Sequence, residues 1–77
     1  MDYKKLLTDI ARGIVDSPDK VVVTETVDGD NIKLLLTVAP EDTGMVIGRH
    51  GKIAKAIRTM MKAASIGNGH HITVEIE

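Results

Sequence analysis

The sequence predicts a two-layer α+β domain in which three helices cover one face of a three-stranded sheet. Segments in which apolar residues recur every three or four positions alternate with segments in which they recur every second position. The order is helix, strand, strand, helix, helix, strand, and segments containing glycine or proline separate these elements. A chain of 77 residues can form one small hydrophobic core. We therefore expect a single domain over residues 1–77, with all helices on the same side of the sheet.

The first three elements are predicted from periodicity and from turn residues. Residues 3–15 have apolar side chains at helical spacing, and Asp2 can cap that helix. Residues 21–27 are rich in β-branched side chains, which favour a strand. The sequence Asp-Gly-Asp-Asn at 28–31 is typical of a hairpin turn, so residues 32–38 should return as a second strand. The side chains expected on the core face of that strand are Ile32, Leu34, Leu36 and Val38.

The second half of the chain predicts two helices and a final strand. Pro40 is suited to a first helical position, and two acidic residues follow it, so a short helix should run to Ile47. The longest helix should begin at Gly51 or Lys52 and end near residues 65–66, before Gly-Asn-Gly. In residues 70–77 apolar and polar side chains alternate, which predicts a strand. The core residues expected on the long helix are Ile53, Ile57, Met60 and Ala64, with Met61 at the edge of this stripe.

The composition argues against several functional classes. There is no cysteine, which excludes a disulfide framework and a thiolate metal site. No segment approaches the roughly 20 apolar residues that span a bilayer, and no signal peptide is evident, so we expect a cytoplasmic protein without a membrane partner. His70 and His71 are adjacent on a strand and should point to opposite faces, so they predict no metal site. We see no nucleophile–base pattern, and we expect neither catalysis nor a cofactor.

The charges are segregated along the chain. The net charge is −1, yet residues 44–66 contain five basic residues and no acidic one. We call these basic residues the basic strip: Arg49, Lys52, Lys55, Arg58 and Lys62. A solvated helix face is the ordinary interpretation of such a pattern. The absence of acidic residues at i, i+4 spacing favours contact with a nucleic acid instead.

The loop at residues 48–51 is the strongest functional signal. Gly48 and Gly51 have no Cβ, so the backbone can adopt positive φ and another backbone can approach closely. The N-terminus of the following helix supplies unpaired N–H groups and the positive end of a dipole, which together suit a phosphate. A tight turn that binds nothing is the alternative. An NTPase phosphate loop is excluded because it needs glycine at Val46 and a hydroxyl residue at Ile53.

The run from Val46 to Arg58 resembles the core motif of KH domains, V-I-G-x-x-G-x-x-I-x-x-I. Ile57 falls on the last isoleucine of the motif, whereas Ile53 stands one position early and Ala54 occupies the motif position. The predicted element order matches the type II, bacterial KH topology. In length and organisation the chain is similar to the KhpA family of small, single-domain bacterial KH proteins. The resemblance implies binding of single-stranded RNA, as an RNA chaperone or a post-transcriptional regulator.

The resemblance also implies roles for individual residues. Gly48 and Gly51 would admit the RNA backbone, and Arg49 and His50 would face its phosphates. Lys52 would lie at the helix start, and Lys55, Arg58 and Lys62 would continue as phosphate contacts. Val46 and Ile47 would line an apolar groove under the bases. The only aromatic residue is Tyr3, so we expect no aromatic stacking platform and low sequence specificity.

A different interpretation is a KH-fold module that acts mainly through association with proteins. The family resemblance implies homodimers and heterodimers with a larger, multidomain KH protein. The small core would gain from association, and Met61 at the border of the apolar stripe is the residue expected at a homodimer contact. The two interpretations are compatible.

Overall fold

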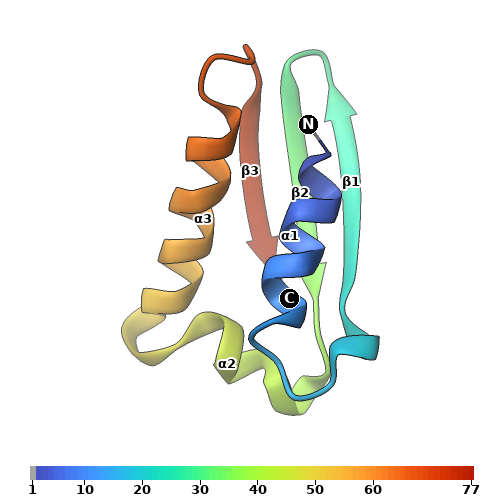
Figure 1. The fold of residues 1–77 in the computed structure, drawn as a ribbon, viewed down its shortest axis with the longest axis vertical. Helices are drawn as coiled ribbons and strands as arrows, with labels where there is room; N and C mark the ends of the chain where they lie inside the picture. Colours follow the sequence, from blue (N-terminus) through green and yellow to red (C-terminus); the bar gives the residue numbers. More distant parts are fainter. Residues whose placement is uncertain (1) are drawn as a thin grey trace.

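The computed structural model describes residues 2–77 and confirms the predicted order of elements and fold class. The helices and strands, in chain order, are α1 (Tyr3–Arg12), β1 (Val22–Asp28), β2 (Asn31–Thr37), α2 (Thr43–Ile47), α3 (Lys52–Ser65) and β3 (His71–Ile76). Short 3-10 turns occupy Pro18–Lys20, Pro40–Asp42 and Arg49–Gly51. Figure 1 shows the helices packed on one face of the sheet, with α1 in front of β2 and with α3 beside β3.

The sheet has the order β1-β2-β3. β1 and β2 form the antiparallel hairpin that the sequence predicts, whereas β3 returns through α2 and α3 and pairs parallel to β2. The alternation expected for residues 32–38 is confirmed, because the four predicted core residues are all buried, three within β2 and Val38 directly after it. In β3, Ile72 and Val74 lie opposite Ile32 and Leu34 and extend the same buried face. This arrangement leaves β3 as an edge strand beside α3.

Two carboxylates at the starts of helices accept hydrogen bonds from backbone N–H groups. The Asp2 side chain accepts a hydrogen bond from the Lys5 backbone N–H at 3.0 Å, which confirms Asp2 as the cap of α1. Asp42 is buried at the start of α2, and its Oδ2 accepts from the Ser17 backbone N–H at 2.9 Å. Because Ser17 belongs to the connection between α1 and β1, this hydrogen bond ties that connection to the base of α2.

The predicted core stripe of α3 is wrong at two of its four residues. Ile57 is buried and Ala64 packs against the core as expected, but Ile53 and Met60 are 38% and 46% exposed, while Ala54 and Met61 are buried. Apolar side chains cover more than half of the circumference of this helix, so periodicity alone allows both phases. Packing against β3 and α1 selects the face that contains Ala54, whose small side chain permits close approach of the helix to its neighbours.

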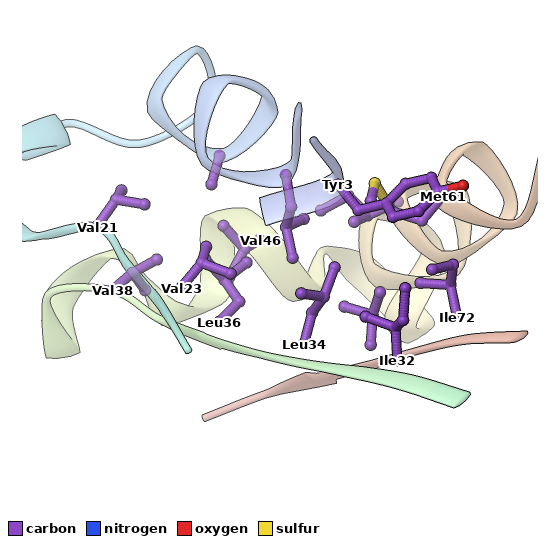
Figure 2. Close-up of a cluster of buried hydrophobic side chains, with 14 of the residues drawn as sticks. Tyr3, Val21, Val23, Ile32, Leu34, Leu36, Val38, Val46, Met61 and Ile72 are labelled. Atoms are coloured by element: carbon purple, nitrogen blue, oxygen red, sulfur yellow. The ribbon is translucent and has the colours of Figure 1, made fainter. Parts of the chain in front are cut away.

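Met61 therefore does not lie at the edge of the core. Its side chain is 0% exposed, and Figure 2 shows it directed into the cluster between the helices and the sheet. The expectation that Met61 is available for a homodimer contact is wrong, because a fully buried side chain offers no surface to a second chain. No helix within residues 2–77 combines the length and the apolar character needed to cross a bilayer.

Candidate nucleic-acid interface

The loop between α2 and α3 has an unusual backbone conformation. α2 ends where the Gly48 N–H donates to the Gly44 carbonyl at 2.8 Å, and Gly48 then takes φ 76°, ψ 175°. His50 (φ 58°, ψ 24°) and Gly51 (φ 73°, ψ 15°) are both left-handed. His50 is the only non-glycine residue with positive φ among residues 2–77. The loop thus holds a strained residue at its exposed tip, which is common at binding sites.

The two glycines of the loop are needed for different reasons. A Cβ at Gly48 would overlap Ile53 Cγ1 and would lie 3.0 Å from the Ile53 backbone nitrogen. The space beside Gly48 is therefore filled by the protein itself, and this glycine allows α3 to start close to the end of α2. A Cβ at Gly51 would meet nothing within 4 Å. Close approach of a ligand backbone is possible at Gly51, and not at the Cβ position of Gly48.

The start of α3 is open to an anion. Its N-cap residue is Gly51, no side chain caps the first turn, and that turn contains no acidic residue. Arg49, His50 and Lys52 are all exposed around this helix end. The N-terminal N–H groups and the positive end of the helix dipole thus face solvent beside cationic side chains, which is the arrangement that binds phosphate groups.

No residue of the basic strip forms an ion pair with another residue of the described range, 2–77. Within residues 2–77, the ion pairs are Lys5–Asp9 at 2.8 Å and Lys33–Glu75 at 3.3 Å, and both lie elsewhere. The hydrogen bond to Asp9 is the main reason that the pKa of Lys5 is raised. In the described part of the chain the basic strip has no carboxylate partner of this kind, so its positive charge remains available for a ligand.

A groove follows the free edge of β3 beside α3. It has a volume of ≈ 210 Å³, and its lining residues are Arg58, Lys62, Ile72, Thr73 and Val74. Arg58 reaches across it, because its Nε donates to the Val74 carbonyl at 3.2 Å. The groove residues of β3 are not among the site residues that the sequence predicts. The topology could have indicated them, since a strand that directly follows a helix commonly packs beside it.

The apolar residues before the loop have separate positions. Val46 is 0% exposed and belongs to the core cluster, where Figure 2 shows it among the buried side chains. The expectation that Val46 lines a groove is wrong, because the side chain faces the sheet and can only support the loop from beneath. Ile47 is partly exposed and remains available to a ligand, as is Ile53 on the other side of the loop.

The only aromatic residue of the chain is part of the core. Tyr3 is 4% exposed, and its ring packs edge-on to His70 with the ring centroids 5.9 Å apart. Its hydroxyl accepts a hydrogen bond from Asn68 Nδ2 at 3.0 Å, which anchors the connection between α3 and β3. Tyr3 is therefore not available to stack on a base.

Comparison with known proteins identifies the family of the chain. A family model described as "KhpA/KhpB, KH domain" matches residues 4–76. The RNA-binding protein KhpA of Clostridium acetobutylicum is 52% identical over 73 residues, which cover 95% of this chain and 97% of the relative. The proteins of the same name from Caldanaerobacter subterraneus and Treponema pallidum are 47% and 42% identical, over 94% and 95% of this chain and 96% and 91% of the relatives. The chain therefore belongs to the KhpA/KhpB family of KH-domain proteins.

Proposed function

We propose that this chain is a single KH domain that binds single-stranded RNA and holds its sugar–phosphate backbone at the loop of residues 48–51. The observation that carries the proposal is the uncapped start of α3, which lies next to an exposed loop and an unpaired basic strip. Relatives that share about half of the sequence are named RNA-binding proteins. A phosphate would sit between Arg49, His50 and the first turn of α3, where Lys52 adds further positive charge.

The neighbouring parts of the site have complementary roles in this proposal. Lys55 and Lys62 continue the electrostatic track along α3 as sequence-independent contacts. Ile47 and Ile53 supply exposed apolar surface beside the loop. Base contacts are aliphatic or hydrogen-bonded, since Tyr3 is committed to the core. A domain of this kind acts on many cytoplasmic RNAs, as an RNA chaperone or post-transcriptional regulator, without an enzymatic step.

The test reverses the charge of the loop. The double substitution Arg49→Asp and His50→Asp places two carboxylates where the phosphate would lie, and both side chains are exposed, so the fold should persist. A matched control is Arg12→Asp with His71→Asp, which makes the same changes at exposed positions outside the loop. Binding to fluorescent single-stranded RNA should be lost in the loop variant and largely retained in the control. If the loop variant binds RNA as well as the wild type, with a native circular dichroism spectrum, the clamp is refuted.

Association with another chain is a second candidate function, favoured by exposed apolar residues on α3 and directly after it. Met60 is 46% exposed, and Ile66, which follows the end of α3, is 81% exposed. A homodimer, or a heterodimer with a larger multidomain KH protein, would cover this surface. Met60→Asp should shift a sedimenting dimer to the 8.3 kDa monomer without unfolding it. A wild-type protein that remains monomeric at high micromolar concentration would leave only the heterodimer.

A further inference from the structure

The free edge of β1 is long and regular. The strand has seven residues, and it pairs with β2 from Val22 to Asp28 without a bulge. Figure 1 shows β1 at the border of the sheet, and no strand of residues 2–77 pairs with its other side. It contains neither proline nor lysine, two residues that commonly protect an edge strand from further pairing. The opposite edge of the sheet is partly occupied, because Arg58 Nε donates to the Val74 carbonyl.

The pairing of β2 shows which backbone groups of β1 are unpaired. The Glu77 N–H donates to the Leu36 carbonyl at 2.9 Å, so Leu36 and the other even-numbered residues of β2 face β3. The odd-numbered residues of β2 face β1, where the antiparallel register pairs them with the even-numbered residues of β1. The N–H and C=O groups that point away from the sheet are therefore those of Val23, Glu25 and Val27.

Acidic residues surround this edge. Residues 16–30 contain five acidic residues and only one basic residue. The acidic residues are Asp16, Asp19, Glu25, Asp28 and Asp30, and all of them are exposed. No ion pair within residues 2–77 involves any of the five. Their negative charge is therefore available to basic groups of a partner.

The side chains of β1 determine what a neighbouring strand must offer. Val22 and Val27 are 56% and 59% exposed, toward opposite ends of the strand, and Glu25 lies between them. A strand that forms hydrogen bonds with Glu25 places one of its own side chains directly beside the Glu25 carboxylate. Because opposite charges stabilise such a cross-strand pair, a matching segment has Lys or Arg at this position and β-branched residues beside the two valines.

We propose that the free edge of β1 binds an extended, basic segment of a partner protein, which joins the three-stranded sheet as a fourth strand. The unpaired backbone groups supply hydrogen bonds, and the acidic residues select a basic segment. The same acidic residues repel the phosphates of RNA. They also disfavour a second copy of this chain, because pairing of two β1 strands would bring two acidic edges together.

The position of this edge separates it from the basic strip. In the sheet order β1-β2-β3, β1 and β3 form opposite edges, and α3, which carries most of the basic strip, lies beside β3. A protein segment on β1 and an RNA at the loop of residues 48–51 can thus be bound together. The inference does not depend on RNA binding, and it adds a second kind of partner on a different surface.

The experiment uses three synthetic peptides with blocked ends. In antiparallel pairing, KVTKTVT places its lysines opposite Asp28 and Glu25, and EVTETVT reverses both charges. The third peptide is KVTKTVT with an N-methyl group on the central lysine, which removes one backbone donor. Heteronuclear NMR of the full, isotope-labelled chain at low salt follows the backbone N–H signals of Val23, Glu25 and Val27.

Two variants of the chain complete the design. Glu25→Lys reverses the charge at the middle of the edge. Glu77→Lys is the matched control, because it makes the same change at an exposed residue directly after β3, on the other side of the sheet. Circular dichroism checks that both variants are folded.

KVTKTVT should shift the three signals with a dissociation constant of about 1 mM or tighter. EVTETVT and the N-methylated peptide should bind about threefold or more weakly. Glu25→Lys should weaken KVTKTVT by about threefold or more and strengthen EVTETVT, whereas Glu77→Lys should change neither. The absence of the shifts at millimolar KVTKTVT, or equal binding of the basic and acidic peptides, overturns the basic partner. Equal binding of the N-methylated peptide overturns the addition of a strand.

Discussion

Replacement of Gly48 by alanine should be far more destabilising than the same change at Gly51. Gly48 takes φ 76°, ψ 175°, a region almost restricted to glycine, and a side chain there costs about 1–3 kcal/mol. The new Cβ also overlaps Ile53 Cγ1, and overpacking of this kind costs about 1–3 kcal/mol more. The two contributions give a loss of roughly 2–6 kcal/mol in the free energy of unfolding.

Two other glycines provide matched controls for the same substitution. Gly51 (φ 73°, ψ 15°) has open space at its Cβ position, so Gly51→Ala carries only the left-handed cost of about 1–2 kcal/mol. Gly44 lies in the first turn of α2 with no heavy atom within 4 Å of its Cβ position and no positive φ. Gly44→Ala should therefore stabilise the protein by about 0.4–1 kcal/mol, because alanine restricts the unfolded chain.

Thermal unfolding followed by circular dichroism can rank the three variants. In a domain of this size, 1 kcal/mol shifts Tm by roughly 4–8 °C. Gly48→Ala should lower Tm by about 8 °C or more. The corresponding loss of about 2 kcal/mol or more is a large part of the free energy of unfolding of a small domain. Gly51→Ala should lower it less, and Gly44→Ala should raise it. A Gly48→Ala protein no less stable than Gly51→Ala would show that Ile53 does not pack against the loop as described, and would refute the reasoning.

Two further predictions concern the loop and the basic strip. His50→Gly should remove a left-handed strain of about 1–2 kcal/mol, and the freer unfolded chain should cost about 0.5–1 kcal/mol. Chemical denaturation should therefore show a net gain of up to about 1.5 kcal/mol. A loss of stability would indicate that the imidazole makes a stabilising contact. Lys55→Ala should weaken the binding of all single-stranded RNAs equally. In titrations at several salt concentrations, it should reduce the slope of log K against log salt by about 0.7. An unchanged slope would show that Lys55 does not contact phosphate.

The sequence by itself determined the elements, the faces of the sheet and the position of the loop. Alternation in residues 32–38 assigned the buried face of β2 correctly, because a strand has a period of two and the other face is polar or half-buried. Asp2 was identifiable as a cap because the chemistry of a helix end is local. The concentration of basic residues in positions 44–66 was also evident from the sequence, since it depends only on the order of residues.

The phase of α3 is an intermediate case. Periodicity favoured Ile53 as a core residue, whereas the KH motif places its apolar residue at position 54. The structure buries Ala54 and leaves Ile53 to pack against Gly48. The motif was the better guide, because it reflects how the helix is oriented after the glycine loop, and the apolar pattern of a single helix does not contain that information.

Only the tertiary structure decided what each residue of the site can touch. Val46 and Met61 are buried because α2 and α3 both pack on the sheet, and the rotation of a helix about its axis is set by its neighbours. The hydrogen bond from Arg58 to Val74 joins residues 16 positions apart, and it exists because β3 pairs parallel to β2 and leaves its other edge open beside α3. Sequence patterns describe contacts within one turn of helix or between neighbours on one strand, whereas a groove between two elements arises from their relative placement in the folded chain.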